Sequence, residues 1–422
     1  MAEHRPPEHV VVVGAGMVGL ATAWFLQAEG VRVTVVDRDG VAAGSSWGNA
    51  GWLAPALTLP LPDPAILATG VKAALSPSSP VYVPFTTNRQ LLTFLAAFTR
   101  HCTPGHWREA MQVFSEANRV SLDAFDALAA GGASEPTHVA DTFLAAFLSE
   151  SDRQSLVHEF ERVDEVGSHT EHELVDGDAA RAIEPALSES VTHGIVLRDQ
   201  RFIDPGRFVN SLADSVRERG GEVLGGVEVD DVVRVGDRVE IRPADGDVID
   251  ADAVVIASGT WLGQLARPHG VRTIVQAGRG YSFFVPLDRK PSNPVYFPAQ
   301  RVACTPLDGT NGTGGLRVAG MMEFRKPNAP PDPRRIRAIV DAVSPLLHGI
   351  DWDTRTDEWV GSRPCTPDGL PLVGPTRTPG VHVAGGHGMW GIALGPLTGQ
   401  LLAAQIARGE TPELLKRLDP LR

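Results

Sequence analysis

A glycine-rich segment near the start of the sequence has the residue types and spacing to bind a phosphate chain. Residues 14–19 read GAGMVG, the pattern G-x-G-x-x-G. In such a turn Gly14 allows a tight bend, Gly16 lets the backbone approach a pyrophosphate, and Gly19 lets a helix pack on the preceding strand. Asp37 follows 18 residues after Gly19 and can accept hydrogen bonds from ribose hydroxyls. The spacing indicates a dinucleotide site and does not separate NAD from FAD.

Two arginines, a tyrosine and a histidine stand at the ends of predicted elements, where side chains can reach a ligand. Arg279 and Tyr281 begin a predicted strand, and Arg363 lies in the segment GSRPCTPDG. A guanidinium is the best partner for a desolvated carboxylate because its planar donors match both oxygens. Arg279 is equally compatible with a salt bridge that supports its strand. His387 could act as a general base, but we favour a structural or substrate-lining role.

The first of these residues are positioned by a strand, a helix and a second strand. Val10 to Val13 predicts a buried parallel strand, a helix follows and ends near Gly30, and residues 31–36 predict a strand that ends on Asp37. This order places the glycine turn at a helix N-terminus. The unpaired N–H groups and the dipole there favour phosphate.

Elements further along the chain predict a larger α/β protein. Apolar faces predict one or two helices over 88–130, and Asp204 is an N-cap for a helix that begins at Pro205. Residues 254–259 predict another buried strand that ends in small residues. Strands and one helix over 272–355 predict a second layer.

The loop after Asp37 is unusual for a fold that binds NAD. Residues 38–51 are small and glycine-rich, so they cannot bury a helix face. Such a loop suits backbone N–H groups laid along an extended ligand, with Ser45 and Ser46 near a pyrophosphate and residues 49–51 near a ring. An ordinary surface loop is the alternative.

Composition excludes several other classes of protein. Three scattered cysteines argue against a disulfide scaffold and a cysteine-based zinc site, and the histidine spacings match no metal site. A net charge of −13 without a basic block makes nucleic acid a poor partner. Residues 10–26 are apolar like a signal-peptide core, but no basic segment precedes them and no cleavage site follows. We therefore expect a cytoplasmic protein without a transmembrane segment; peripheral contact with the inner face of the membrane stays open.

Taken together, the motifs resemble the FAD-dependent D-amino acid oxidase superfamily, and most closely the bacterial D-amino acid dehydrogenases of the small-subunit type. The resemblance begins with VVVGAGMVGLATAWFL, VTVVDRD and GSSWGNAGWLAP. It continues through HGIVLRDQRFIDPGRF, GRGYSFFVP, GSRPCTPDGLPLVG and GGHGMWGIALGPLTG, and so covers nearly the whole chain.

The resemblance implies an α/β fold with two parts. One is an FAD-binding Rossmann-like domain of the glutathione-reductase type, discontinuous over residues 1–88, 188–270 and 356–422. The other is an inserted α+β substrate domain, built on an antiparallel sheet, from residues 89–187 and 271–355.

The resemblance also implies which residues contact FAD. The turn after residue 256 would close over the diphosphate, the backbone near Val229 would face the adenine, and N–H groups before the last helix would face the flavin C2 carbonyl. The implied set is Gly14, Ala15, Gly16, Met17, Val18, Gly19, Asp37, Arg38, Ser45, Ser46, Asn49, Ala50, Gly51, Val229, Ala257, Gly259, Trp261, Arg363, Gly386, His387, Gly388, Met389, Trp390 and Gly391.

The activity implied is oxidative deamination of a D-amino acid. A hydride moves from Cα to flavin N5, and the imino acid hydrolyses to a 2-oxo acid and ammonia. By resemblance Arg363 anchors the substrate carboxylate and Tyr281 is a second contact. Related sarcosine oxidases attach their flavin through a cysteine at the position of Gly361, seven residues before Asp368, so we expect non-covalent FAD here.

Three alternatives stay open. The substrate could be a cyclic or N-substituted amino acid, such as a D-hydroxyproline or sarcosine. The chain could be an NAD-dependent dehydrogenase, or a flavoprotein without catalytic activity. The electron acceptor could be oxygen, a quinone or another electron-transfer partner, because the sequence carries no signal for it.

Overall fold

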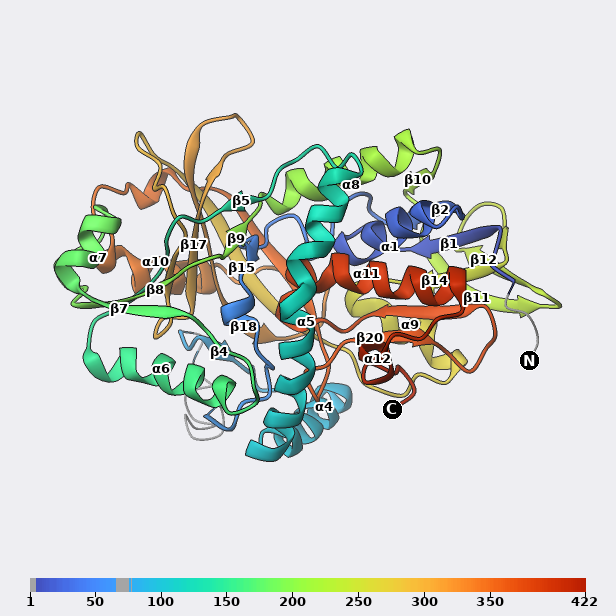
Figure 1. Cartoon of the computed structure of the whole chain (residues 1–422), viewed down its shortest axis with the longest axis horizontal. Helices are drawn as coiled ribbons and strands as arrows, with labels where there is room; N and C mark the ends of the chain where they lie inside the picture. The colour runs from blue at the N-terminus through green and yellow to red at the C-terminus, as the bar shows by residue number, and fades with distance from the viewer. Residues whose placement is uncertain (1–4, 66–75, 77) are drawn as a thin grey trace.

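Residues 5–65, 76 and 78–422 are described in the structure, which is a computed structural model. They form two main sheets, and the long helix α5 (Pro104–Ala130) crosses the molecule between them (Figure 1). The predicted α/β class, with a parallel sheet and a separate antiparallel sheet, is confirmed.

The first sheet is built from short valine-rich segments, because branched side chains pack well on a pleated surface. Five of its strands run parallel, and β20 is antiparallel to its neighbour β21. The order across the sheet is β10 (Glu222–Gly225), β2 (Arg32–Asp37), β1 (His9–Val13), β14 (Ala253–Ile256), β21 (Val381–Gly385) and β20 (Leu372–Pro375).

Side chains alternate between the two faces of this sheet, so each face has its own core. Val10 and Val12 pack on the side of three helices, while Val11 and Val13 pack on the side of a small antiparallel sheet. The helices are α1 (Met17–Ala28), α8 (Pro205–Glu218) and α11 (Gly391–Arg408). The other face is covered by β11 (Val229–Val235), β12 (Arg238–Pro243), β13 (Ile249–Ala251) and the helix α9 (Leu262–Ala266).

The second, larger sheet is mostly antiparallel. Its order is β19 (Thr356–Cys365), β15 (Gln276–Pro286), β18 (Gly314–Phe324), β17 (Val302–Asp308), β16 (Val295–Phe297), β6 (Phe143–Phe147), β8 (His193–Leu197) and β7 (His172–Asp176), with β4 (Val81–Tyr82) beside β18. Helix α10 (Pro333–Val343) covers the face that carries Phe283 and Val318. The opposite face is the one that meets the loop after β2.

Shorter elements complete the described chain. A third small sheet contains β3 (Trp52–Leu53), β9 (Arg201–Phe202) and β5 (His138–Val139). The remaining helices are α4 (Arg89–His101), α6 (Glu150–Asp164), α7 (Gly177–Ile183) and α12 (Glu413–Lys416), with 3-10 turns η1 (Pro55–Leu57), η2 (Gly259–Trp261), η3 (Arg267–His269), η4 (Ser344–Leu346), η5 (Trp352–Thr354) and η6 (Gly388–Trp390).

Several predicted elements are confirmed. The strand, helix and strand over residues 10–37 are β1, α1 and β2. Asp204 is the N-cap of α8, and its Oδ1 accepts a hydrogen bond from the Arg207 N–H at 3.0 Å. The apolar stretch over 88–130 forms two helices, α4 and α5, which separate at Cys102.

Sheet membership divides the chain differently from the predicted domain boundaries. Strands β8 and β19 lie within the spans assigned to the FAD-binding domain, yet both pair with strands of the larger sheet. Helix α5, assigned to the substrate domain, packs against α1 and α11. The reason is that pairing and apolar faces decide where an element lies, and neither follows from its place in the chain.

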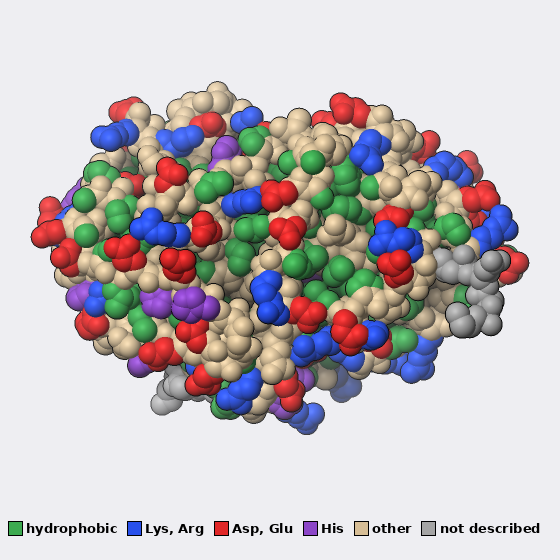
Figure 2. All heavy atoms as spheres, in the orientation of Figure 1, with side chains coloured by type: hydrophobic (Ala, Val, Ile, Leu, Met, Phe, Trp, Pro, Cys, Tyr) green, Lys and Arg blue, Asp and Glu red, His purple; other side chains and the backbone are tan. Residues whose placement is uncertain are grey.

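The surface carries mixed charge. Figure 2 shows acidic and basic side chains interspersed over one face of the molecule, with no broad area of a single sign. No helix in the described part of the chain is both long and apolar enough to cross a membrane.

Candidate functional site

The glycine turn between β1 and α1 forms one end of a cavity. Gly14 has φ +121°, and a side chain there would place its Cβ 2.4 Å from the Ala257 carbonyl oxygen at the end of β14. At Gly19 a Cβ would lie 2.0 Å from the Gly14 oxygen, so α1 packs directly on the turn. Both positions therefore exclude a side chain. The roles predicted for Gly14 and Gly19, a tight bend and close packing of the helix, match this geometry.

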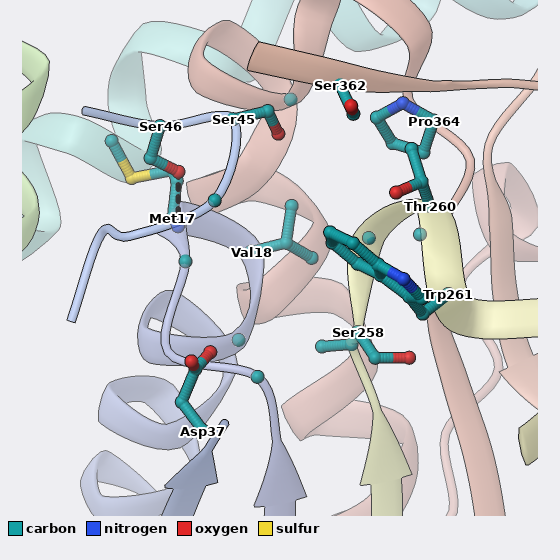
Figure 3. Close-up of a pocket in the computed structure, with 18 of the residues that line it drawn as sticks. Met17, Val18, Asp37, Ser45, Ser46, Ser258, Thr260, Trp261, Ser362 and Pro364 are labelled. Atoms are coloured by element: carbon teal, nitrogen blue, oxygen red, sulfur yellow. Dashed lines mark hydrogen bonds between the residues drawn. The ribbon is translucent and has the colours of Figure 1, made fainter. Parts of the chain in front are cut away.

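The start of α1 is left without a side-chain cap by its own N-cap residue. Gly16 is the N-cap and makes no side-chain hydrogen bond, and the first turn contains no acidic residue. Ser46, from the loop after β2, accepts a hydrogen bond from the Met17 N–H at 3.3 Å (Figure 3). Because that bond uses the oxygen of Ser46, its hydroxyl proton stays available to a phosphate oxygen. The helix N-terminus and Ser46 thus form an anion site.

Asp37 stands at the end of β2 and fixes the glycine turn as well as facing the cavity. Its Oδ2 accepts a hydrogen bond from the Ala15 N–H at 2.8 Å. Its Oδ1 accepts from the N–H groups of Asp39 and Gly40, both at 2.9 Å. A carboxylate has about four acceptor positions, so one stays open for a ribose hydroxyl. Asp37 thus has a structural role that its spacing alone did not reveal.

The opposite wall comes from the turn after β14. Trp261 stands across the cavity from the glycine turn in Figure 3, and the guanidinium carbon of Arg38 lies 4.5 Å from its ring centroid. A side-chain hydrogen bond to Asp39 raises the pKa of Arg38. The segment that begins β11 also lines this end, and its Val227 N–H donates to the Asp37 carbonyl at 2.9 Å. One end of the cavity is therefore bounded by Asp37, Trp261 and Val229.

The start of α11 lines the other end of the cavity. Trp390 is the N-cap of this helix and its side chain does not cap the helix, and the first turn contains no acidic residue. His387 lies just before it, 1% exposed, with Nε2 at 2.8 Å from the Thr398 hydroxyl. Burial lowers the pKa of His387 to about 4, so the imidazole is neutral at neutral pH. Backbone donors and a neutral ring are what this end offers a ligand.

Arg363, on β19, supplies the cavity with a cation. Its Nη1 donates to the Met321 carbonyl at 3.0 Å, and it forms no ion pair with an acid in the described part of the chain. Burial lowers the pKa of its guanidinium. The side chain lies flat over β15, because a Cβ on Gly280 would be 2.2 Å from the Arg363 Cζ. The arrangement leaves a partly buried guanidinium that faces the cavity and could bind an anion.

Arg279 and Tyr281, which were predicted as substrate contacts, do not line this cavity. The Tyr281 hydroxyl donates to Glu323 Oε1 at 2.7 Å and accepts from the Asp332 N–H at 3.0 Å. Arg279 forms an ion pair with the same carboxylate at 3.1 Å, and both side chains are at most 1% exposed. Burial, followed by the bond to Glu323, raises the pKa of Tyr281 to about 12. Side chains alternate along a strand, so Arg279 and Tyr281 face α10 while Gly280 faces Arg363.

Most of the predicted cofactor residues do come together. Those that line the cavity are Gly14, Gly16, Met17, Val18, Gly19, Asp37, Arg38, Ser45, Ser46, Asn49, Val229, Ala257, Gly259, Trp261, Arg363, His387, Gly388, Met389 and Gly391. Those that support it from behind are Ala15, Ala50, Gly51, Gly386 and Trp390.

Several residues in the cavity wall were missed. Ser362 precedes Arg363 in the same strand, Thr260 and Gln264 follow the buried strand β14, and Pro327 comes from a proline-rich linker. Ser362 and Thr260 were accessible to prediction, since both neighbour residues already assigned to the site. Pro327 carried no signal, because its linker reaches the cavity only through the folding of β18.

An extended dinucleotide fits these groups. The two uncapped helix starts, the close glycines and Asp37 occupy positions along one cavity, as a molecule with a pyrophosphate between two ring systems requires. Gly361 bears on whether the cofactor is attached covalently at this position, because a Cβ there would lie 1.9 Å from the Trp359 ring. A cysteine at this position could not be accommodated without moving that indole, which supports a non-covalent cofactor.

Comparison with known proteins agrees with the site. The family model described as FAD dependent oxidoreductase matches residues 9–405. The fold is shared with glycine oxidase from Geobacillus kaustophilus (TM-score 0.75, 19% identity, 99% of each chain covered) and glycine oxidase from Bacillus cereus (0.71, 19%, 97% of each). It is also shared with L-proline dehydrogenase from P. horikoshii (0.69, 17% identity, 99% of this chain and 98% of that one). At these identities the structures show a common fold, whereas the family match spans nearly the whole chain. The protein therefore belongs to the FAD dependent oxidoreductase family and uses FAD as its cofactor.

Proposed function

We propose that this protein oxidises the Cα–N bond of a D-amino acid, giving an imino acid that hydrolyses to a 2-oxo acid and ammonia. The observation that carries the proposal is Arg363. Its guanidinium lies in the cavity wall, enclosed by protein, without an acid partner in the described part of the chain. Burying a cation without an anion is costly, and a substrate carboxylate would supply the missing charge.

The residues of the chain suit this reaction in three ways. Arg363 binds the carboxylate with its planar fork and so fixes the direction in which Cα points. The backbone N–H groups at the start of α11 stabilise negative charge at their end of the cavity. His387 is neutral and tied to Thr398, so it shapes the site rather than drawing a proton from the amine. FAD, when bound, supplies the two-electron acceptor for the hydride that leaves Cα.

A cyclic or N-substituted amino acid is the second candidate substrate. The same Cα–N oxidation applies to such a substrate, and the shared fold of L-proline dehydrogenase favours keeping it. Both candidates carry a carboxylate, so both require Arg363. They differ in whether the nitrogen is primary or secondary.

Anaerobic reduction of the flavin tests the proposal directly. Purified holoprotein is mixed without oxygen with a panel of D-amino acids, L-amino acids, prolines and N-methyl amino acids, and the loss of flavin absorbance is followed. We expect bleaching by D-amino acids and release of ammonia. Bleaching by the prolines or N-methyl amino acids alone would favour the second candidate. A flavin that no member of the panel reduces would refute both.

A further inference from the structure

The loop Ser45–Gly51, which we call the cofactor loop, lines the cavity between the two helix starts. Ser45, Ser46 and Asn49 face the cavity. On the side of the first sheet the loop is fixed at both ends, by the bond from the Met17 N–H to Ser46 and by a bond from the Ile203 N–H to the Gly51 carbonyl at 2.9 Å. The centre of the loop has to be held by something else.

That support comes from the larger sheet. The Ser282 hydroxyl, on β15, donates to the Gly48 carbonyl at 2.7 Å. The Thr305 hydroxyl, on β17, donates to the Ala50 carbonyl at 2.7 Å and accepts from Trp52 Nε1 at 2.9 Å. Ser282 and Thr305 are both fully buried. The two hydroxyls therefore bind alternate carbonyls of the cofactor loop.

The two carbonyls bound by the sheet flank a residue that meets the cavity. Residues 41–49 form turns and a bend, and one residue lies between the two carbonyls that bind the sheet. That residue is Asn49, which lines the cavity. Its Oδ1 in turn accepts from the Gly51 N–H at 3.0 Å and closes the turn.

A third contact fixes the same stretch. The guanidinium carbon of Arg317, on β18, lies 5.0 Å from the ring centroid of Trp47. Arg317 is aligned with Thr305 in the pairing of β17 and β18. Three neighbouring strands of the larger sheet thus contact one short loop of the FAD site, although neither Ser282, Thr305 nor Arg317 lines the cavity.

We propose that Ser282 and Thr305 are positioning residues for FAD: they hold the cofactor loop in its binding conformation, so that the substrate-side sheet determines the affinity of the cofactor. Without these hydroxyls the Gly48 and Ala50 carbonyls would lose their donors, and the loop would sample other conformations before FAD binds. Ordering the cofactor loop on binding would then cost free energy, and FAD would bind more weakly.

The test measures the affinity of FAD for the apoprotein by quenching of flavin fluorescence in Ser282→Ala, Thr305→Val and Thr305→Ser. We expect about tenfold weaker binding in each of the first two variants, since each leaves a buried carbonyl without a donor. Thr305→Ser restores the hydroxyl and should return the affinity to near the wild-type value. Amide hydrogen exchange of residues 45–51 in the apoprotein should be faster in Ser282→Ala and Thr305→Val.

Ser188→Ala is the matched control. The buried Ser188 hydroxyl donates to the Pro345 carbonyl at 2.8 Å, a bond of the same kind beside α10 and outside the cofactor loop. It should lower the melting temperature and leave the FAD affinity within twofold. If Ser282→Ala and Thr305→Val also stay within twofold, the two hydroxyls only stabilise the fold and the proposal is wrong. If Thr305→Val does not fold, Ser282→Ala decides. The readout involves no substrate, so it is independent of the proposed reaction.

Discussion

Two arginines, Arg279 and Arg363, lie on neighbouring strands and differ both in burial and in what surrounds them: Arg279 is buried, whereas Arg363 is partly exposed. In the pairing of β15 and β19, Arg279 is aligned with Ser362 and Arg363 with Gly278. Arg279 faces α10 and finds the carboxylate of Glu323, whereas Arg363 faces the cavity and finds only the Met321 carbonyl in the described chain. The two side chains therefore differ in counter-charge as well as in burial: Arg279 is paired with an acid, and Arg363 is the cation for which we propose a carboxylate ligand.

The environments of the two arginines are built differently. Around Arg279, Glu323 also accepts from the Tyr281 hydroxyl, and Arg325 lies 3.6 Å from its second oxygen. Around Arg363 there is a glycine beneath the guanidinium and no acid. The charge of Arg279 is balanced by Glu323, whereas no acid among the described residues forms an ion pair with Arg363.

The largest effect is expected from substituting Arg363, the arginine that lines the cavity. Arg363→Met should lower kcat/KM for a carboxylate substrate by about two to four decades, because losing the partner of a buried charge costs about 3–5 kcal/mol. Steady-state kinetics with the best substrate of the anaerobic panel measures it. Arg363→Lys should recover only part, since it lacks the planar fork. An amine without the carboxylate should be a poor substrate and lose little more in the variant. Near-normal kcat/KM with full flavin content would show that Arg363 is structural.

Arg279→Met should act on stability instead. Glu323 would be left buried without its ion pair, and we expect the free energy of unfolding to fall by about 3 kcal/mol. Urea denaturation measures this change, and kinetics on the folded fraction should give a kcat/KM close to that of the wild type. A large loss of kcat/KM at unchanged stability would reverse the comparison and assign Arg279 to the substrate.

Gly280→Ala tests whether the position of the Arg363 guanidinium depends on the space that the glycine leaves beneath it. The added methyl group would displace Arg363, and we expect the KM for carboxylate substrates to rise by about tenfold, or roughly 1.4 kcal/mol. The ratio of bound flavin to protein should not change. A normal KM would mean that the guanidinium binds the substrate from another position, or does not bind it.

The smallest effect is expected from Tyr281→Phe. Glu323 loses one donor and the Asp332 N–H loses its acceptor, so the free energy of unfolding should fall by about 1–2 kcal/mol. The KM for the substrate should not change, because the hydroxyl faces away from the cavity. Parallel measurement of thermal unfolding and KM checks both statements. A raised KM at unchanged stability would restore Tyr281 as a substrate contact.

The same comparison explains what sequence reasoning could and could not reach. The glycine turn, Asp37 and the helix start at Gly16 follow from local rules, since each depends on neighbours within about 25 residues. Arg279 and Arg363 look alike in the sequence because each stands within two residues of a glycine. Only pairing between distant strands shows that one of them meets Glu323. A bulge between Arg279 and Tyr281 in the pairing with β18 shifts that register, and no residue pattern announced it.

The contacts between the cofactor loop and the larger sheet could not be predicted from the sequence either. Ser45, Ser46 and Asn49 were assigned to the cofactor from the composition of their own segment, and all three line the cavity. Ser282 and Thr305 lie more than 230 residues further along, and nothing in their own strands marks them as partners of Gly48 and Ala50.

The order of strands in the first sheet has a consequence for how the protein is made. Val10 pairs with Ala253, and Val254 pairs with Val381, so the strand that carries the glycine turn lacks a neighbour on one side until over 240 further residues have been translated. At about 5–20 residues per second this is a wait of roughly 12 to 50 seconds on the ribosome. Helix α11, which packs on α1, is the last element that lines the cavity to be translated. The FAD site is therefore completed only late in synthesis, and the glycine turn, its earliest translated part, stays without its later neighbours for the longest time.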